Sequence, residues 1–314
     1  MQEQGSICSA TIAYCIVNGT IDYELAGKER AVQRAAAKGP DKESIELFSD
    51  LILSYYRQYG RDLPWRRTAD PYSILVSEIM LQQTQVERVA PKYTLFIDQF
   101  KTIDCLASAP LSSVLSAWSG LGYNRRAVNL QKTAIILRDE YNSLVPEDPA
   151  ILERLPGIGK ATASAICAYA FNMPVVYIET NIRRICIHYF FQDRDNIHDA
   201  ELLPIIRDTL YHDNPREWYS ALMDYGTHLK KRNDNPNKRS RHYTRQAPFA
   251  GSDREIRGSA LRLLLEREEI NKSALIGALA GTGNRERGRI ERVLADLEKE
   301  GFVREDAGLY SIKE

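Results

Sequence analysis

A short glycine-containing segment between two helical stretches has the composition of an anion-binding turn. It runs Leu-Pro-Gly-Ile-Gly-Lys and ends with Gly157, Ile158, Gly159 and Lys160. Two glycines around one apolar residue permit a tight turn with positive φ, and the first turn of the next helix has N–H groups without intrahelical partners. Lys160 adds a cation at this helix terminus, and Ile158 can anchor the turn in the core. The segment therefore predicts contact with a nucleic-acid phosphate, and a plain turn between two helices is the alternative.

A second candidate is a polar face inside the apolar stretch from Ser77 to Val86. If this stretch forms one helix, Glu78, Gln82 and Gln85 lie on the same face, because they are spaced four and then three residues apart. A carboxyl group held on such a face can donate a proton to a leaving group. Glu78 is therefore a candidate acid, although by this pattern alone an exposed helical Glu without a catalytic role is the favoured interpretation.

Cationic side chains gather in one block near the end of the helical region. Seven Lys or Arg residues and one acidic residue lie between His228 and Arg245, whereas the whole chain has 42 basic and 42 acidic residues. The block predicts contact with phosphates, although the overall charge does not indicate a polyanionic partner. Its basic residues are Lys230, Lys231, Arg232, Lys238, Arg239, Arg241 and Arg245.

The composition excludes several classes of protein. With 314 residues, 44% hydrophobic and 27% charged, the chain is expected to form about two folded domains. Its five cysteines include no Cys-x-x-Cys pair, which argues against a disulfide framework or a zinc knuckle and indicates a reducing compartment. The apolar stretch at residues 7–17 is short for a membrane span and lacks a preceding positive charge, so we expect a cytoplasmic protein without a membrane segment.

Helical periodicity dominates the sequence from Ser44 onward, which predicts an all-α core. Several breaks in which Asp or Asn precedes Pro suit helix starts. The first 43 residues have weak periodicity and are expected to form an extension of uncertain order. The expected helices of the core after residue 70 lie around residues 72–88, 92–100, 111–118, 125–141, 160–171, 181–192, 199–211 and 216–229.

A different pattern follows the basic block and predicts a small C-terminal α+β module. Three helical stretches precede two short apolar segments around a turn at residues 306–308, an order that resembles a winged helix. Its third helix could read nucleic acid through Arg285, Arg287, Arg289 and Arg292, and a docking or dimerisation module is the alternative. The expected domains are an extension (1–43), a helical core (44–231), a basic linker (232–251) and the winged-helix-like module (252–314).

Four segments, in order and spacing, resemble those of the helix-hairpin-helix (HhH-GPD) base-excision DNA glycosylases, and the MutY-type adenine glycosylases in particular. They are Asp62–Trp65, Ser77–Val86, Gly120–Tyr123 and Leu155–Lys160. The resemblance covers residues 62–229 and implies a core of two helical lobes. It also implies that the partner is double-stranded DNA that contains a mismatched or damaged base.

The resemblance implies roles for the residues of these segments. Such an enzyme extrudes one nucleotide from the duplex, and Gln82, Gln83 and Tyr123 would fill the gap that this nucleotide leaves. Glu78 would protonate the leaving purine, and general acid catalysis of this kind is typically worth ~10² to 10⁴-fold in rate.

A second carboxylate should stabilise positive charge on the sugar, and the matching segment contains Glu179 and Asn181. Most relatives have Asp at the position of Glu179. One additional methylene moves the carboxylate by roughly 1.5 Å, and a misplacement of ~1 Å can cost ~10² in rate. Asn181 matches the family and would hold the carboxylate or a water molecule. We expect Glu179 to serve as the anion.

Two further departures bear on the chemistry. Ala161 lies where the bifunctional glycosylase/lyases of this superfamily carry Lys, so the resemblance implies base removal without strand cleavage. Many relatives bind a [4Fe-4S] cluster through four Cys, and residues 226–245 contain none. We therefore expect no metal and no cofactor.

The sequence thus predicts a monofunctional DNA glycosylase of base excision repair, active as a monomer and associated with the nucleoid. Adenine opposite guanine or 8-oxoguanine is the expected target. One alternative is a thymine or uracil mismatch glycosylase. Another is a non-catalytic protein that binds mismatched or damaged DNA, with Glu179 marking the loss of chemistry. A third is a helical protein whose hairpin makes protein contacts.

Overall fold

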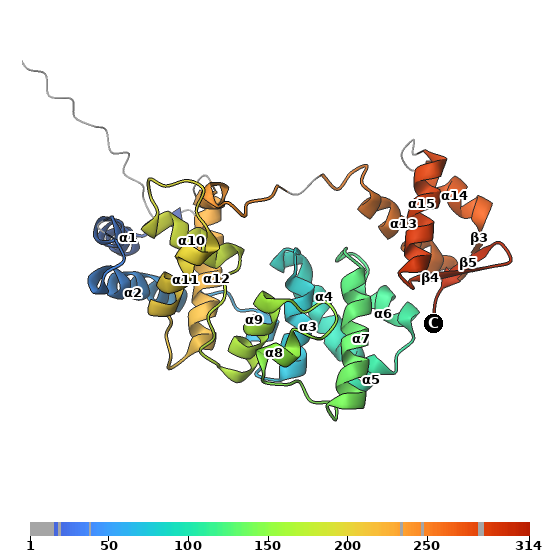
Figure 1. Cartoon of the computed structure of the whole chain (residues 1–314), viewed down its shortest axis with the longest axis horizontal. Coiled ribbons are helices and arrows are strands. Elements are labelled where there is room, and N and C mark those ends of the chain that lie inside the picture. The colour runs from blue at the N-terminus through green and yellow to red at the C-terminus, as the bar shows by residue number, and fades with distance from the viewer. Residues whose placement is uncertain (1–15, 18–19, 38, 233–234, 246–247, 282–285) are drawn as a thin grey trace, which may run out of the picture. The chain divides into compact units, whose positions relative to one another are not determined.

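The computed structural model describes residues 16–314 apart from 18–19, 38, 233–234, 246–247 and 282–285, and it forms two compact units (Figure 1). Unit 1 consists of the described residues up to Arg61 and of those from Pro174 to Tyr243. Unit 2 consists of Asp62–Met173 and Thr244–Glu314. Each unit therefore combines segments that are far apart in the sequence.

Unit 1 is built on helices that pack around a cluster of aromatic side chains. Helix α12 contacts both α10 and α2, and α1 contacts α2 and α10. Phe48 lies edge-on to Tyr189 and Trp218, with ring centroids 5.9 and 6.1 Å apart. The elements of this unit are β1 (Ile16–Val17), β2 (Thr20–Ile21), α1 (Tyr23–Ala36), α2 (Lys42–Tyr59), α10 (Thr180–Phe190), α11 (Asp199–Asp208), α12 (Pro215–Arg232) and the 3-10 turn η2 (Pro236–Arg239).

Helix α1 lies in the region that the sequence analysis treated as an extension of uncertain order. Its start is capped by Asp22, whose carboxylate accepts from the Leu25 amide at 3.0 Å, and Leu25 and Val32 are buried. The apolar periodicity is weak because the buried face also contains Glu29, whose charge is paired with Arg232 at 2.6 Å. Residues 1–15 lie outside the described part of the chain.

Part of the expected basic linker also belongs to unit 1. The turn η2 contacts α10, and Asn237 of this turn is buried and donates to the Thr180 carbonyl at 2.9 Å. Ser240 forms an isolated bridge with Ile197. The ordered fold of unit 1 therefore continues past α12.

Unit 2 begins with seven helices and a short 3-10 turn. Helix α3 packs against α9 and α4, and α7 packs against α5 and α6. Their bounds are η1 (Pro64–Arg66), α3 (Pro71–Leu81), α4 (Val86–Gln99), α5 (Ile103–Ala107), α6 (Leu111–Trp118), α7 (Arg125–Glu140), α8 (Pro149–Leu152) and α9 (Lys160–Phe171).

The C-terminal module of unit 2 has the three helices and the terminal hairpin expected from the sequence, and one additional strand. The strands form an antiparallel sheet in the order β3-β5-β4, in which Ile270 pairs with Tyr310. The elements are α13 (Asp253–Arg267), β3 (Glu269–Asn271), α14 (Lys272–Gly281), α15 (Arg287–Lys299), β4 (Val303–Asp306) and β5 (Leu309–Ile312).

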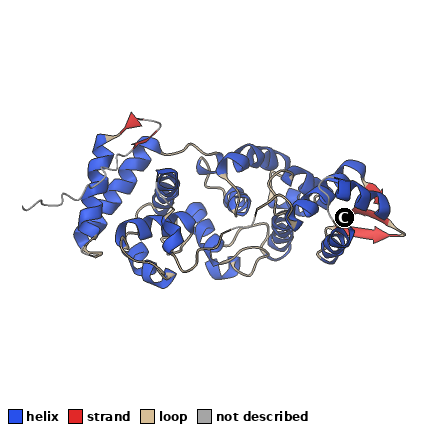
Figure 2. Cartoon of the chain, turned by 90° about the horizontal axis from the view of Figure 1, so that it is seen from above, coloured by secondary structure: helices blue, strands red, loops and turns tan. Residues whose placement is uncertain are grey.

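Helices dominate the residues that Figure 2 draws, and the short strands are confined to the amino-terminal pair and the C-terminal module. The predicted fold class, an all-α core with a small α+β module, is confirmed. Among the described helices, none is both long enough and apolar enough to cross a membrane.

Candidate active site

The polar residues from Glu78 to Gln85 do not lie on one helix, which corrects the sequence prediction. Helix α3 ends at Leu81, Gln83 has a left-handed backbone with φ 56°, and α4 begins after Gln85. Glu78 is half-buried on the last turns of α3. Two of the three candidate gap-filling residues, Gln82 and Gln83, therefore lie on a tight turn directly after the helix that carries the candidate acid.

Arg126 satisfies the carbonyl groups at the end of α3, and the sequence analysis did not identify it. Its Nη1 donates to the carbonyl oxygens of Ile79, Met80 and Gln82 at 2.9, 2.8 and 2.6 Å. A helix terminus leaves such carbonyl groups without intrahelical partners, and a cation satisfies them well. Burial lowers the pKa of Arg126 to about 10, so the side chain stays charged at neutral pH.

The same guanidinium group holds the loop that carries Tyr123. Nη2 of Arg126 donates to the Gly122 carbonyl at 3.0 Å and to Thr84 Oγ1 at 2.9 Å, so it joins this loop to the glutamine turn. The guanidinium carbon also lies 5.6 Å from the centre of the Tyr123 ring, within the range of a cation–π contact. Tyr123 is half-buried and, like Gln83, has a left-handed backbone, with φ 49°.

Left-handed backbone conformations are strained for residues other than glycine. Each costs of order 1 to 3 kcal/mol and persists only where the surrounding structure imposes it, often at functional sites. Arg126 supplies that constraint on both segments. The two strained residues are ones that the sequence analysis assigned to filling a gap in DNA.

The glycine-containing turn is a hairpin between α8 and α9. Gly157 has φ 77°, and a Cβ atom there would lie 2.8 Å from the Asn129 side chain. Ile158 is buried, as predicted, and Gly159 precedes the first residue of α9, Lys160, which is exposed. The geometry agrees with the predicted turn and places a cation at a helix amino terminus.

Gln82 connects the glutamine turn to this hairpin. Its side-chain amide donates to the Gly157 carbonyl and to Thr162 Oγ1, both at 3.1 Å. Unit 2 thus brings together the candidate acid Glu78, the glutamine turn, the Tyr123 loop and the hairpin. Arg126 and Gln82 provide the cross-links among them.

The remaining candidate catalytic residues, Glu179 and Asn181, lie in unit 1 at the start of α10. The half-buried Glu179 carboxylate caps this helix: Oε1 accepts from the amide of Asn181 and, at 2.9 Å, from that of Ile182. Oε2 accepts a longer hydrogen bond, 3.3 Å, from the Asn181 side chain. Burial raises the pKa of Glu179, and the two amides and the nearby Arg184 and Arg183 oppose this rise.

Asn181 is also fixed through its side-chain oxygen. The buried Arg184 donates to Asn181 Oδ1 at 2.6 Å and to the Gly226 carbonyl at 2.8 Å. A Cβ atom on Gly226 would lie 2.6 Å from that of Asn181, so α12 approaches α10 closely at this point. The chain therefore holds the carboxylate and the amide in one defined arrangement.

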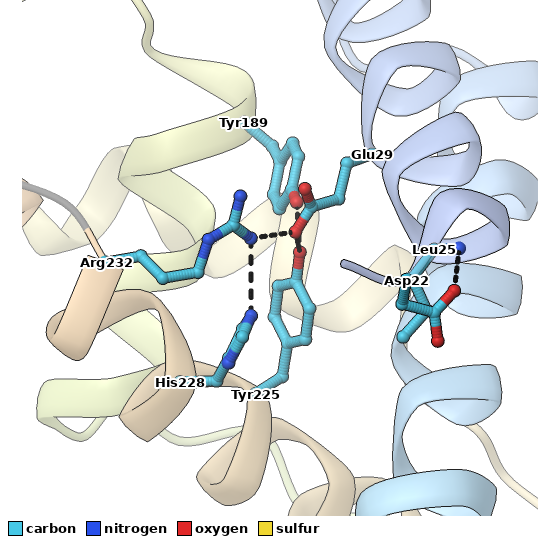
Figure 3. Close-up of polar contacts among 7 residues, drawn as sticks. All are labelled: Asp22, Leu25, Glu29, Tyr189, Tyr225, His228 and Arg232. Atoms are coloured by element: carbon cyan, nitrogen blue, oxygen red, sulfur yellow. Dashed lines mark hydrogen bonds and ion pairs between the residues drawn. The ribbon is translucent and has the colours of Figure 1, made fainter. Parts of the chain in front are cut away.

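The basic block divides into structural and exposed cations. Lys230 and Lys231 are exposed, in agreement with a role on phosphates. Arg232, also predicted to bind DNA, instead pairs with Glu29 at 2.6 Å and lies 3.2 Å from Nε2 of His228. Figure 3 shows that Glu29 also accepts from Tyr225, at 2.8 Å.

Some other arginines of the expected DNA-binding segments are also paired internally. Arg239 donates to the Gln192 carbonyl at 2.6 Å. In the C-terminal module, Arg287 pairs with Glu291 at 3.0 Å and Arg289 with Asp253 at 2.6 Å. Arg285 lies outside the described residues. Internal pairing reduces the positive charge that these side chains offer to DNA.

Comparison with known proteins identifies the family. Residues 76–203 match the model described as HhH-GPD superfamily base excision DNA repair protein. The adenine DNA glycosylase of Mycolicibacterium smegmatis is 36% identical over 230 residues, which cover 68% of this chain and 78% of the relative. The chain belongs to the HhH-GPD superfamily.

Two further members show the breadth of the resemblance. The adenine DNA glycosylase of Buchnera aphidicola subsp. Baizongia pistaciae is 42% identical over 184 residues, 57% of this chain and 52% of the relative. The chain thus spans about half the length of that relative. A solved structure of a thermostable thymine-DNA glycosylase has a TM-score of 0.54 and 28% identity, covering 58% of this chain and 85% of that one.

The segment after α12 does not fit the iron–sulfur cluster that many HhH-GPD proteins carry. Such clusters are held by Cys thiolates, and the sequence has no Cys after Cys186. The described residues of this segment present cationic and amide nitrogen donors, such as those of Arg239 and Asn237, to backbone carbonyls. Within the described residues, no group of three or more His, Cys, Asp or Glu side chains is placed to hold a metal ion.

Proposed function

We propose that this HhH-GPD protein is a monofunctional DNA glycosylase that removes a mispaired adenine, opposite guanine or 8-oxoguanine, from double-stranded DNA. The observation that carries the proposal is the arrangement in unit 2, where Arg126 and Gln82 tie two strained polar segments and the glycine-containing hairpin to the helix of Glu78. This is the set of parts that base extrusion requires. The adenine DNA glycosylases among its relatives support the choice of base.

In the proposed reaction, the hairpin and the exposed Lys160 bind a phosphate, and Gln83 and Tyr123 occupy the space of the extruded nucleotide. Glu78 donates a proton to a ring nitrogen of adenine. The bond between that base and C1′ of the sugar then breaks, and its electron pair leaves with the base. A carboxylic acid assists a purine in this way, because a purine ring nitrogen readily accepts the proton.

The positive charge left on the sugar needs a fixed anion until water adds to C1′ and loses a proton. We assign this role to Glu179. Its Oε1 is engaged by the two amides of α10, so Oε2, with its longer contact to Asn181, is the oxygen directed to the reaction. Asn181 keeps that oxygen in position.

We further propose that the reaction stops at the abasic site. Ala161 follows Lys160 on the first turn of α9, is exposed, and offers no amine for a Schiff base with the sugar. The protein is expected to act as a monomer on nucleoid DNA and without an iron–sulfur cluster. Iron and sulfide analysis of the purified protein tests the last point.

A mismatched thymine is the second candidate target, because one solved structure with 28% identity and a TM-score of 0.54 is a thymine-DNA glycosylase. Single-turnover base release from duplexes with A:8-oxoguanine, A:G, T:G and U:G pairs tests both candidates. We expect the fastest release from the A:8-oxoguanine duplex, followed by A:G. Faster release of thymine than of adenine would instead identify mismatched thymine as the target base. Mismatch binding without release from any duplex would indicate a non-catalytic DNA-binding protein.

A further inference from the structure

The C-terminal module contacts Tyr123, one of the proposed gap-filling residues, through the side chain of Arg254. Nη1 of Arg254, on α13, donates to the Tyr123 hydroxyl at 2.6 Å, and its guanidinium carbon lies 5.5 Å from the centre of the Tyr123 ring. The same group lies 6.0 Å from the ring of Phe249 and donates to the Pro248 carbonyl at 3.2 Å. Arg254 therefore lies in contact with Tyr123 and with the segment that leads into α13.

A second contact fixes the module close to Tyr123. Glu300, at the end of α15, pairs with Arg125 at 2.6 Å, and Arg125 is the first residue of α7, two positions after Tyr123. Arg257 of α13 also donates to the Glu300 carboxylate, at 3.1 Å. Helix α13 contacts α6 as well. These contacts hold Arg254 beside the loop through more than its own hydrogen bond.

The position of Arg254 complements that of Arg126. Arg126 lies 5.6 Å from the centre of the Tyr123 ring and holds the loop backbone through the Gly122 carbonyl. Arg254, in contrast, binds the hydroxyl at the far end of the side chain. Arg126 thus holds the backbone next to Tyr123, and Arg254 holds the hydroxyl group of its side chain. A ring that must enter a base step benefits from such preorganisation, because less side-chain entropy is lost when it inserts.

We propose that Arg254 is a positioning residue for Tyr123 and that the C-terminal module is, through this contact, part of the base-flipping machinery. The proposal rests on the proposed function, since it gives Tyr123 a place in distorted DNA. It differs from a role in which the module binds DNA by itself. Arg254 acts on DNA through Tyr123.

The test compares Arg254→Ala with Arg262→Ala, which removes an exposed arginine from the same helix. Flipping is followed by the fluorescence of 2-aminopurine placed beside a mismatched adenine, and base release is followed under single-turnover conditions. Loss of a charge-assisted hydrogen bond and a cation–π contact should slow both processes about 10- to 100-fold. Arg262→Ala should leave both unchanged, and Arg254→Lys should restore part of the rate. Equal losses for the two alanine variants would overturn the proposal.

A double-mutant cycle separates positioning from a direct DNA contact. In a Tyr123→Ala background, Arg254→Ala should cause no further loss of flipping, because the residue through which it acts is already absent. The same loss in both backgrounds would overturn the proposal. A salt dependence of DNA binding that is weaker in Arg254→Ala, by the equivalent of about one phosphate contact, would also overturn it.

Urea unfolding of each variant identifies any loss of activity that arises from misfolding. If Arg254→Ala is misfolded, Arg254→Lys takes its place in the comparison. If the wild type flips but releases no base, the proposed function fails, while the flipping data still decide the role of Arg254.

Discussion

At the scale of single residues, the arrangement of unit 2 depends most on Arg126. Its guanidinium group donates to the carbonyl oxygens at the end of α3, to a hydroxyl on the glutamine turn and to the loop before Tyr123. Because the group is buried, its removal would leave the buried carbonyl groups at the end of α3 without their charged donor. Arg126 therefore has a structural role with functional consequences.

Arg126→Met should lower the free energy of unfolding by about 3 kcal/mol, because several buried carbonyl groups lose a charged donor. It should also slow base release, since Gln83 and Tyr123 lose their shared constraint. Lys132→Met removes an exposed cation from the same helix and should change neither. Urea denaturation of both variants checks the prediction. Equal stability of the two variants would show that Arg126 does not hold the site together.

The pKa of His228 allows a prediction of how the stability of unit 1 depends on pH. Burial, assisted by the charges of Arg232 and Lys231, lowers the pKa of His228 from 6.5 to about 4. His228 therefore takes up a proton at a lower pH in the folded state than in the unfolded chain. The free energy of unfolding falls as the pH drops from about 6.5 toward 4. This loss should reach the order of 3 kcal/mol. In His228→Gln, urea denaturation between pH 7 and pH 4 should show a smaller loss, and an unchanged loss would exclude His228 as its source.

At the scale of elements, most candidate residues lie at or near the ends of helices. The turn after α3, the loop before α7, the hairpin before α9 and the capped start of α10 carry most of them, and Glu78 lies on the last turns of α3. Helix ends expose backbone donors and acceptors that can be directed to a ligand, whereas helix interiors do not. The strained residues Gln83 and Tyr123 lie at two of these ends.

Gln83 is expected to contribute to function at a cost in stability. Gln83→Gly should raise the free energy of unfolding by about 1 kcal/mol, because glycine adopts φ 56° without strain. It should also slow base flipping, since the side chain that fills the gap is lost. Gln83→Ala should slow flipping equally without the gain in stability. A glycine variant that is more stable and flips at the wild-type rate would contradict the role of Gln83 in DNA.

The hairpin before α9 requires glycine at only one of its two glycine positions. At Gly157, φ is 77° and an added Cβ would collide with Asn129, so Gly157→Ala should cost about 1 to 3 kcal/mol and weaken DNA binding. Gly159→Ala meets nothing within 4 Å and should leave the fold as stable as that of the wild type. Thermal or urea denaturation of the two variants distinguishes these outcomes. Equal losses would contradict the conformation assigned to the turn.

Sequence reasoning located most helices but not the interactions that end them. It placed α9 at residues 160–171, as observed, because glycine and lysine signals mark its start. It extended a helix from residue 72 to 88, because the segment from Ser77 to Val86 contains no glycine or proline. The cation that satisfies the end of α3 comes from Arg126, more than forty residues later. Helix α1 was missed for a related reason: its buried face includes Glu29, whose partner Arg232 lies some 200 residues away.

At the scale of the whole molecule, the candidate catalytic residues come from both units. Unit 2 contains the proposed acid Glu78 and the proposed gap-filling residues, and unit 1 contains Glu179 and Asn181. The candidate catalytic residues themselves were identified from the family resemblance, since each is an ordinary polar residue by local pattern alone. The structure adds the residues that hold them, such as Arg184 beside Asn181.

Glu179→Asp tests whether the carboxylate of Glu179 is placed less favourably for the reaction than the shorter Asp of the family pattern. The substitution removes one methylene, and correct placement of the carboxylate can be worth about 10² in rate. If Glu179 is the anion but is placed less favourably than Asp, the Glu179→Asp variant should release base up to about 10² times faster than wild type under single-turnover conditions. Asn181→Ala should slow release. Release at the same rate by wild type, Glu179→Asp and Glu179→Ala would exclude this position from the chemistry.

The most direct test of the proposed function is the yield of free adenine and of alkali-labile strand breaks from an A:8-oxoguanine duplex, measured for wild type and Glu78→Gln. We predict that wild type releases adenine and leaves a strand that breaks only after alkali treatment. Glu78→Gln should bind the duplex as tightly but release adenine about 10² to 10⁴ times more slowly. Glu87→Gln, which changes an exposed residue on α4, serves as the control. Equal rates for wild type and Glu78→Gln, or tight binding by wild type without any release, would contradict the proposed acid and the proposed enzyme.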